Sequence, residues 1–378
     1  MTKPQFTLIP SAYKVNTVYS VLPVDGSGDM TFSRGSEATR VRQDGLIENV
    51  LSNTPRLNWL NSNCPSLLLE PQRTNYAINS SNASLWANVS GSQSITKTQN
   101  YAISPDGTHT AARIQANATG SNYSLIQLST SSFIGNYAGS VYLKSNTGNI
   151  ENVIVYGRNT SVTSYPIGNE WQRIEIQGSG TSGQNLYLFL GSFPNNGSDE
   201  SVDILVWGGQ LEQGTYTSSY IPTPAITTRI NDVCGNGGDS DLFDITEGSF
   251  FVDVLPYNAG LVSTISLSNN STSQRILIQF QSNGTQVRLF SSGGVSNYQT
   301  ITFNQRNKIL VTFKLNEYKF YINGALVSTD TSATVPTSLD RVNFSNSTAN
   351  SDFFQGEVND TRVYNIVLTE AEAIKLTT

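Results

Sequence analysis

Short runs of apolar and β-branched residues, each closed by Gly, Asn, Ser or Pro, recur along most of this chain and constrain its fold more than any other feature. Between residues 76 and 222 such runs occupy 140–144, 153–156, 171–176, 186–190 and 202–207. Residues 171–176 alternate apolar and polar side chains, which is the pattern of a strand with one buried face. Several strands at this spacing predict an antiparallel β-sandwich.

The same pattern resumes after residue 245 and predicts a second sandwich. Its runs occupy residues 249–255, 275–281, 287–290, 308–315, 318–322 and 353–364. Asn323-Gly324 lies between two of these segments, and this dipeptide accepts the positive φ angles of a type I′ hairpin turn. Thr369 followed by Glu372 forms a capping-box pattern, so a short helix is expected at the end of the chain.

Composition agrees with an all-β fold of two tandem antiparallel sandwiches. Charged residues make up only 13% of the 378 residues, so Asn, Ser, Thr and Gly carry most of the surface polarity. Ser, Thr and Asn compete with helical backbone bonds, whereas Thr, Val, Ile, Tyr and Phe suit a pleated sheet. A chain of this length is expected to form two or three domains.

The predicted organisation has four parts. Residues 1–75 show little periodicity and are expected to be an extended segment for docking and oligomerisation; the alternative is an ordinary irregular N-terminal subdomain. Residues 76–222 form the first sandwich and residues 245–378 the second. Residues 223–244 contain Pro224 and the run Cys234-Gly-Asn-Gly-Gly, which is typical of a linker.

Nucleic acid and membranes are not expected as partners. The formal net charge is -6, and no basic block is present that would neutralise phosphates. No run of eighteen apolar residues occurs, and the first residues lack the pattern of a signal peptide, so we expect synthesis and retention in the cytoplasm. Cys64 and Cys234 have neither disulfide nor metal-ligand spacing, and both are interpreted as buried thiols.

Catalytic chemistry has little support in the sequence, and we predict that the protein is not an enzyme. Glycan hydrolysis would need a pair of carboxylates, and no such pair can be singled out. His109 is the only histidine, so a Ser-His-Asp arrangement and a multi-histidine metal site are both disfavoured. No cofactor is expected, although the spaced acids Asp239, Asp241 and Asp244 are weak candidates for calcium binding.

Aromatic side chains are the remaining candidates for a binding role, because sugar rings stack on exposed Trp and Tyr. Trp171 and Trp207 lie within predicted strands and are expected in the core. Trp86 and Tyr298 lie in polar surroundings and are the weak candidates for glycan binding. The alternative is that both are partly buried packing residues.

The first 75 residues also resemble a known family. The resemblance is carried by residues 40–41, 45–50 and 55–57, and above all by residues 64–75, which end in Leu69, Glu70, Pro71, Gln72, Arg73, Thr74 and Asn75. This run looks like the N-terminal region of phage head-fibre and tail-associated structural proteins. The resemblance implies that these seven residues form a docking and oligomerisation motif.

The two strand-rich zones carry further resemblances. Residues 104–107, 140–144, 171–173 and 207–214 are similar to the carbohydrate-binding-module-like jelly roll that follows in those phage proteins. Residues 320–324, 356–358, 362–365 and 368–372 look like a laminin-G/concanavalin-A-like sandwich. The resemblances cover nearly the whole chain, and they imply fold and particle context more strongly than sugar binding.

These resemblances imply a phage head fibre or capsid-decoration subunit on the virion surface, made in the host bacterial cytoplasm. Its expected partners are itself, as a dimer or trimer, other capsid or tail proteins, and host cell-surface polysaccharide. Three alternatives remain open: a tail-associated adsorption protein, a glycan depolymerase, and a cellular carbohydrate-binding adhesin. The adhesin would require an export signal, and the first residues lack the pattern of one.

Overall fold

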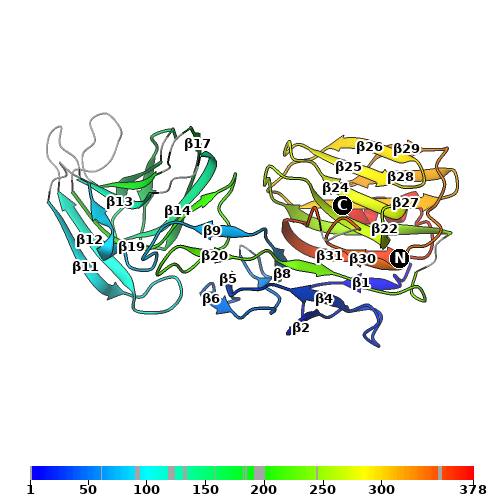
Figure 1. Ribbon diagram of the computed structural model, residues 1–378, viewed down its shortest axis with the longest axis horizontal. Helices are drawn as coiled ribbons and strands as arrows, with labels where there is room; N and C mark the ends of the chain where they lie inside the picture. Colours follow the sequence, from blue (N-terminus) through cyan, green and yellow to red (C-terminus); the bar gives the residue numbers. More distant parts are fainter. Residues whose placement is uncertain are drawn as a thin grey trace. The chain divides into compact units, whose positions relative to one another are not determined.

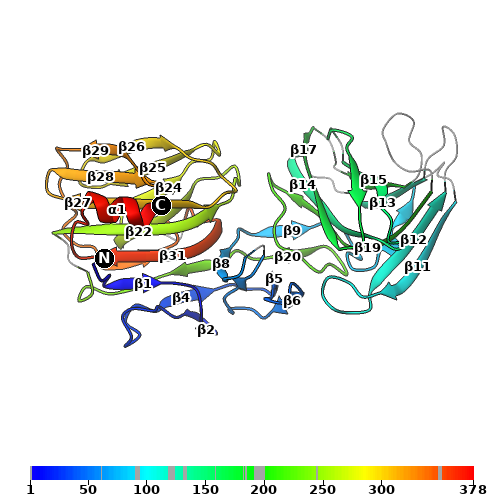
Figure 2. The ribbon, with the colours of Figure 1, turned by 180° about the vertical axis from the view of Figure 1, so that it is seen from behind.

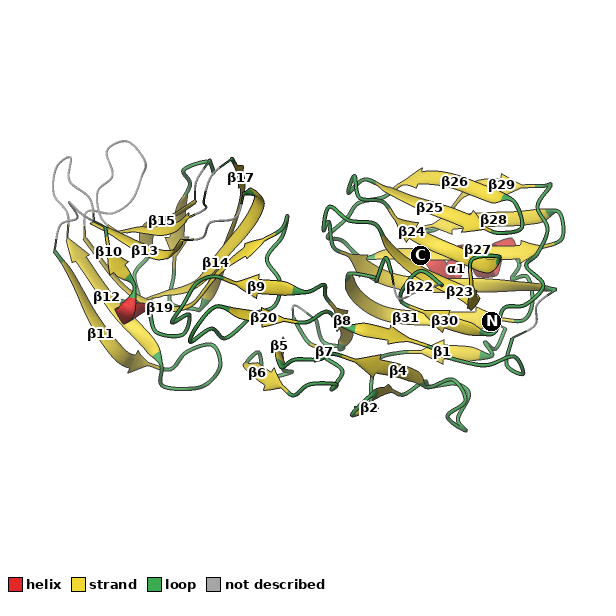
Figure 3. Ribbon diagram, viewed as in Figure 1, coloured by secondary structure: helices red, strands yellow, loops and turns green. Residues whose placement is uncertain are grey.

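The computed structural model describes residues 2–60, 62–89, 94–117, 124–130, 134–157, 159–181, 183, 185–190, 201–243, 246–347 and 351–378 (Figure 1). The chain divides into two compact units. Unit 1 comprises Met1–Glu37, Val50–Pro71 and Ile230–Thr378, and unit 2 comprises Ala38–Asn49 and Gln72–Arg229. Almost all regular structure in the described residues is β-strand (Figure 3), which confirms the predicted all-β class.

The larger sheet of unit 1 contains strands from both ends of the chain. Its order is β29 (Ala325–Asp330), β28 (Glu317–Ile322), β27 (Asn307–Lys314), β22 (Glu247–Pro256), β31 (Gly356–Tyr364), β8 (Ser66–Leu69) and β7 (Leu57–Asn58), with β1 (Phe6–Leu8) also paired to β31. Asn323 and Gly324 have φ angles of 47° and 84°, which confirms the predicted hairpin turn between β28 and β29.

The second sheet of unit 1 runs in the order β26 (Val295–Thr300), β25 (Gln286–Ser291), β24 (Gln274–Phe280), β23 (Ser263–Ser271) and β30 (Arg341–Asn343). Another sheet follows the order β2 (Tyr13–Lys14), β3 (Thr17–Val18), β4 (Met30–Ser33) and β21 (Val233–Gly235). Backbone bonds between Gly237 and Val342, and from Phe344 N to Cys234 O, place β21 beside β30. The N-terminal strands therefore extend both layers of the sandwich.

One continuous apolar core fills the space between the two layers of unit 1. Alternate residues of each strand supply it, such as Phe250 and Val252 on β22 and Ile276 and Ile278 on β24, all fully buried. Phe6 of β1 belongs to the same core and is also fully buried. Burying a side chain of this size stabilises the folded state by about 1.5–3 kcal/mol.

Helix α1 (Glu370–Thr377) packs on the side of the larger sheet that faces away from this core (Figure 2). Ala373 and Leu376 of the helix contact Leu310 and Tyr321 of the sheet in a separate apolar cluster. Thr369 Oγ1 accepts from the backbone N–H of Glu372, whose carboxylate accepts in return from Thr369 N–H. The predicted capping box is confirmed.

Unit 2 contains a second sandwich. One sheet runs in the order β11 (Ile95–Ala102), β12 (Ala111–Asn117), β19 (Ser201–Gln213), β14 (Gly135–Ser145) and β17 (Gln172–Gly180). The other runs in the order β10 (Ala87–Asn88), β13 (Ser124–Thr130), β18 (Asn185–Leu190), β15 (Glu151–Gly157) and β16 (Ser164–Ile167). The 3-10 turn η1 (Ala83–Leu85) precedes β10.

Two short ribbons complete unit 2. β5 (Ala38–Val41) pairs with β6 (Ile47–Val50), and β9 (Arg73–Asn75) pairs with β20 (Thr227–Arg229). The β5–β6 hairpin contributes Ile47 to a cluster with the buried rings of Trp207 and Tyr220. The predicted core position of Trp207 is confirmed, since its side chain is only 1% exposed.

These bounds differ from those expected from the sequence. Residues 1–37 and 50–71 pair and pack within unit 1, and residues 38–49 lie in unit 2. The expected linker, residues 223–244, contains strands β20 and β21. Strands of two to four residues have too short a pattern to be recognised, and their partners lie far away in the sequence.

Two observations bear on the environment of the chain. No helix within the described ranges is long and apolar enough to cross a membrane. Cys234 is buried, as predicted, but the prediction for Cys64 was wrong because that residue is exposed. Cys64 lies between β7 and β8, and its side chain is not part of the core.

Candidate functional site

The second sheet of unit 1 presents a mixed aromatic and cationic row on the side that faces away from the core. On β25, Val287 and Leu289 point into the core, so the alternation of a strand directs Arg288 and Phe290 to the other side. Register places Arg288 directly opposite Tyr298 on β26. On β24, Arg275 precedes the core residue Ile276 and lies on the same outer side.

These four side chains form what we call the outer-face ladder: Arg275, Phe290, Arg288 and Tyr298. The guanidinium carbons of Arg275 and Arg288 lie 5.2 Å and 4.7 Å from the centre of the Phe290 ring. The guanidinium carbon of Arg288 also lies 5.4 Å from the centre of the Tyr298 ring. Such cation–π contacts hold the guanidinium groups in position. Tyr298 is 49% exposed.

A pocket of about 220 Å³ lies beside the ladder on unit 1. Its polar lining consists of four amides and three hydroxyls, and we call it the asparagine pocket: Thr31, Asn236, Asn270, Asn343, Ser345, Asn346 and Ser347. These residues come from β4, from the segment after β21, from the end of β23 and from β30 with the chain that follows it.

Hydrogen bonds among the amides fix the asparagine pocket. Asn343 Oδ1 accepts from the backbone N–H of Asn236 at 2.8 Å, and Asn343 Nδ2 donates to Asn270 Oδ1 at 3.1 Å. Asn270 Nδ2 donates to Asn236 Oδ1 at 3.3 Å. Asn236 and Asn270 have φ angles of 58° and 63°, a left-handed conformation that Asn tolerates better than most residues.

Arg275 connects the ladder to the pocket. Its Nη1 donates to Asn346 Oδ1 and, at 3.4 Å, to Ser347 Oγ. Burial and the nearby charge of Arg288 lower the pKa of Arg275, whereas the charge of Asp352 raises it. The pocket and the ladder therefore form one continuous polar and aromatic face.

This face has the groups that sugar recognition requires. Amides and hydroxyls offer paired donors and acceptors for ring hydroxyls, and an exposed aromatic ring offers a surface on which a sugar can stack. A few convergent polar groups beside apolar surface are typical of small-ligand sites.

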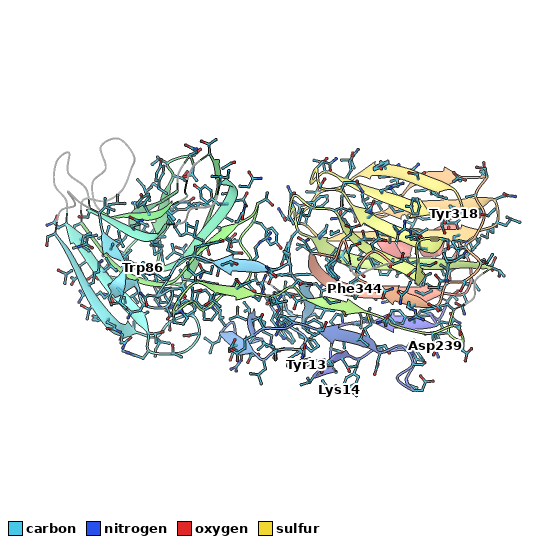
Figure 4. All side chains as sticks on the ribbon, in the orientation of Figure 1. Tyr13, Lys14, Trp86, Asp239, Tyr318 and Phe344 are labelled. Carbon is cyan, nitrogen blue, oxygen red and sulfur yellow. The ribbon has the colours of Figure 1, made fainter. Side chains whose placement is uncertain are left out.

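The two aromatic candidates from the sequence have different positions. Tyr298 lies in strand β26 and is exposed, as a stacking surface requires. Trp86 lies in unit 2 (Figure 4), where its side chain is only 4% exposed and its Nε1 donates to Asn79 O at 3.2 Å. The ring packs into the core against Gly209, which agrees with the alternative that Trp86 is a packing residue.

The calcium candidates remain a prediction. Asp239 Oδ1 accepts from the backbone N–H groups of Asp241 and Leu242, so this carboxylate stabilises its own turn (Figure 4). Asp244 lies outside the described residues. Within the described residues, no group of three or more His, Cys, Asp or Glu side chains is arranged to hold a metal ion.

The seven motif residues are divided between the two units, with Leu69, Glu70 and Pro71 in unit 1 and the other four in unit 2. Leu69 is in the core of unit 1, and the carboxylate of Glu70 pairs with Arg56 at 2.7 Å. Asn75, fully buried in unit 2, donates from Nδ2 to Gly209 O and Ile221 O. Asn75 Oδ1 also accepts from two backbone N–H groups.

The intervening motif residues are less buried. Arg73 pairs with the buried carboxylate of Glu212 at 3.7 Å, and Thr74 shares a hydrogen bond with Thr228 across the β9–β20 ribbon. Pro71 is half-buried and Gln72 is exposed. The motif thus makes mainly internal contacts, and its docking role stays a prediction.

Glu212 itself lies in a pocket of positive charge within unit 2. Burial raises the pKa of Glu212, while hydrogen bonds from Ser218 and the charges of Arg229 and Arg73 lower it. This buried carboxylate is used to hold the chain after β19 and has no exposed surface for a ligand.

Sequence reasoning did not find a pair of acids on the larger sheet of unit 1. Asp253 of β22 and Asp360 of β31 lie opposite each other in the register. Arg306 binds Asp253 through both carboxylate oxygens at 2.5 Å, and Arg362 Nη2 binds Asp360 at 2.6 Å. Each acid has its own arginine partner, so the two carboxylates take part in ion pairs across neighbouring strands.

A third carboxylate, Glu357, lies on the same strand as Asp360. It accepts hydrogen bonds from Ser66 Oγ at 2.7 Å, Tyr257 OH at 3.0 Å and Asn58 Nδ2 at 3.4 Å. Burial raises the pKa of Glu357, and these hydrogen bonds lower it. The partners of Glu357 lie at least 100 positions away in the sequence, so spacing along the chain does not indicate this group of residues.

Only part of the outer-face ladder can be predicted from the sequence. The alternation Val287-Arg288-Leu289-Phe290 does predict that Arg288 and Phe290 share one face. Pairing of β24, β25 and β26 then decides that Arg275 and Tyr298 lie beside them, and a sequence does not specify this pairing directly.

Comparison with known proteins supports the fold of this region. A family model described as the Concanavalin A-like lectin/glucanases superfamily matches residues 250–373, which include β24, β25 and β26. The match confirms the predicted concanavalin A-like sandwich in the C-terminal region. No curated protein sequence matches the chain.

Solved structures with partial likeness include sugar-binding modules. The Ruminococcus gnavus IT-sialidase CBM40 bound to α2,3-sialyllactose has 16% identity and a TM-score of 0.30, over 35% of this chain and 84% of the other. Domain 4 of AbnA, an extracellular arabinanase from Geobacillus stearothermophilus, in complex with arabinotriose, has 16% identity and a TM-score of 0.33, over 44% and 82%. The Caenorhabditis elegans galectin LEC-6 has 13% identity and a TM-score of 0.24, over 31% and 82%.

Proposed function

We propose that the protein is a non-enzymatic structural subunit on the surface of a bacteriophage particle and that unit 1 binds glycans there. The single observation that carries the binding role is the continuous face made by the outer-face ladder and the asparagine pocket. It combines an exposed tyrosine ring with four amides and three hydroxyls that line a pocket of about 220 Å³. Such a set matches the alternating hydroxyls and apolar faces of a sugar.

The family match favours the same role. Residues 250–373 contain the three strands that carry the ladder, and the matching family includes lectins by its description. Proteins with the same fold can have different functions, so the glycan-binding role has to be argued from the site and not from the fold.

The particle context is supported by the resemblance of residues 40–75 to phage head-fibre and tail-associated proteins. A head fibre or decoration subunit is favoured, and a tail-associated adsorption protein is the alternative that shares every sequence feature. In either place a dimer or trimer would present several weak sites at once, which multiplies the effective affinity for a host polysaccharide. Synthesis in the host bacterial cytoplasm belongs to the same proposal.

A glycan array tests the binding role. The full chain is labelled and applied to a panel of neutral, carboxylated and sulfated glycans, beside the Tyr298→Ala variant. We expect binding to a subset of glycans and a loss of about tenfold or more in the variant, as removal of one stacking ring costs about 1–2 kcal/mol.

Tyr101→Ala is the matched control. Tyr101 lies in unit 2, is 40% exposed and also has an arginine, Arg113, over its ring at 5.0 Å. Its substitution should leave the array signal unchanged. Absence of any glycan binding, or equal loss in both variants, would refute binding at this face.

The particle role has separate tests. Mass spectrometry of purified phage particles should detect the chain, and light scattering of the full chain should give a dimer or trimer. A strictly monomeric chain that is absent from particles would contradict the structural role. Release of reducing sugar ends from a bound polysaccharide would instead favour the depolymerase alternative, with Asp253 and Asp360 as the acids to substitute.

A further inference from the structure

We propose that the ligand of the outer-face ladder and the asparagine pocket is a glycan that carries a carboxylate, an inference that rests on the proposed function. The observation is that, among the described residues, the two ladder arginines have no acidic partner in an ion pair. Five arginines of unit 1 form ion pairs with Asp or Glu: Arg34, Arg56, Arg306, Arg341 and Arg362. Arg275 and Arg288 form none with any described residue.

The two arginines without an acid partner are neighbours. Both guanidinium groups lie against the single ring of Phe290. Like charges on neighbouring side chains repel each other, and this repulsion adds to the effect of burial in lowering the pKa of Arg275. The nearest acid in the cluster, Asp352, interacts with Arg275 but accepts its hydrogen bond from Asn346 Nδ2. An added anion would relieve the repulsion.

The orientation of Arg288 suits a carboxylate in particular. Its Nε donates to Ser296 Oγ at 3.1 Å, and the rings of Phe290 and Tyr298 lie against its guanidinium group. None of its bonds to described residues uses Nη1 or Nη2, so two parallel N–H groups remain for a ligand. A carboxylate accepts two such bonds in one plane, and this bidentate arrangement is stronger than a neutral hydrogen bond.

Arg275 offers a second contact next to the pocket. Its Nη1 donates to Asn346 and Ser347, but its buried Nε has no hydrogen-bond partner among the described residues. Arg275 lies against the same Phe290 ring as Arg288 and bonds to Asn346, so it connects the proposed carboxylate site to the amides of the asparagine pocket. The two arginines would attract a carboxylate only locally, because the chain as a whole has a net charge of -6 and would repel anions elsewhere.

Three polymers that share one sugar backbone and differ in their charged groups can separate the effect of charge from recognition of the sugar. Binding of the full chain to dextran, carboxymethyl dextran and dextran sulfate is measured at low salt and at about 0.5 M NaCl, where exposed charges are strongly screened. We expect carboxymethyl dextran to bind at least about tenfold more tightly than dextran and more tightly than dextran sulfate. Equal binding of dextran and carboxymethyl dextran, no binding of any polymer, or tightest binding of the sulfate would overturn the proposal.

Two substitutions of Arg288 test the geometry. Arg288→Gln should abolish the preference for carboxymethyl dextran, and Arg288→Lys should restore only a small part of it because lysine keeps the charge but lacks the paired N–H groups. Lys314→Gln is the charge-matched control, since Lys314 lies on the larger sheet and pairs with Glu317. Carboxylate binding that survives in Arg288→Gln, is fully restored in Arg288→Lys, or falls equally in Lys314→Gln would contradict the proposal.

Failure of this inference can be told apart from failure of the proposed function. If the array finds a neutral glycan whose binding depends on Tyr298, the glycan-binding role stands while the carboxylate preference is refuted. If no glycan of any charge depends on Tyr298, both are refuted.

Discussion

Arg56 and Asp232 form an ion pair inside unit 1, although 176 residues separate them in the chain. Both side chains are completely buried. Arg56 also binds Glu70, and the other oxygen of Asp232 accepts from Arg34 at 3.1 Å. Burial opposes the charge of Arg56, but Asp232 and Glu70 outweigh this effect and raise its pKa. This network ties the residue before β7 and the residue after β8 to the residue before β21.

We expect Arg56→Ala to destabilise unit 1 by about 3–5 kcal/mol, because the carboxylates of Glu70 and Asp232 would remain buried without their shared cation. Urea denaturation gives the free energy of unfolding, and hydrogen exchange of peptides from β22 and β31 assigns the loss to unit 1. Arg42→Ala removes an exposed arginine that pairs with Asp44, and it should cost less than about 1 kcal/mol. Equal costs for the two variants would contradict a buried network.

The first strand should contribute to the stability of unit 1 in the same way as any core strand. Phe6 is fully buried and packs against Phe243 with ring centres 6.1 Å apart. Phe6→Ala should therefore cost about 3–5 kcal/mol, whereas Val24→Ala, at a side chain that is 90% exposed, should have almost no effect. A Phe6→Ala variant as stable as the wild type would show that β1 does not pack in the core in solution.

This expectation changes how assembly should be tested. A chain that starts at Asn75 would lack β1, β7 and β8, and so would lose strands of the larger sheet and Leu67 and Leu69 of the core. Such a truncation is expected to unfold unit 1. The mass of the full chain, and not of the truncated one, is the informative measurement of oligomeric state.

Local patterns in the sequence were sufficient for the long strands and for the turns. The segment 140–144 lies in β14, 153–156 in β15, and 318–322 in β28, because each carries a run long enough to show its period. Asn323-Gly324 and the Thr369–Glu372 capping box were also predicted, since both depend on residues close in sequence.

Features that depend on distant residues could not be predicted in this way. The strands β1, β4, β7 and β8 have two to four residues each, and they are stabilised by partners such as β31 and β21. Buried charges such as Asp232 were not expected either, because an acid is normally exposed unless a partner is known. The outer-face ladder needed the pairing of three strands before its members could be placed together.

The motif ending at Asn75 is expected to stabilise unit 2 independently of any docking role. Asn75→Ala would remove four hydrogen bonds and leave the carbonyls of Gly209 and Ile221 and two buried N–H groups without this partner. The cost should be about 2–4 kcal/mol, localised by hydrogen exchange to β9 and β19. Gln72→Ala, at an exposed position of the same motif, should cost less than about 0.5 kcal/mol. The reverse order of costs would contradict the structural role of Asn75.

Glu357 should make the stability of unit 1 depend on pH. Because burial raises its pKa in the folded state above the usual value of 4.5, the folded protein binds more protons than the unfolded chain. The contribution of Glu357 to stability therefore decreases as the pH rises from about 4.5 through the raised folded pKa, and it is constant outside that window. Glu357→Gln removes this titration and keeps one oxygen, which can accept from either Ser66 or Tyr257, because these two hydroxyls donate to different oxygens of Glu357.

The difference in free energy of unfolding between Glu357→Gln and the wild type is the quantity to measure, because the other titrating groups cancel in it. We expect this difference to shift in favour of the variant as the pH increases above about 4.5, since only the wild type then has to bury a charge. Urea denaturation at several pH values provides the measurement. Glu317→Gln is the control: hydrogen bonds from Lys314 lower the pKa of Glu317, so its difference should shift in favour of the wild type as the pH rises. A Glu357→Gln difference that does not change with pH would mean that the carboxylate of Glu357 is as well solvated in the folded state as in the unfolded chain.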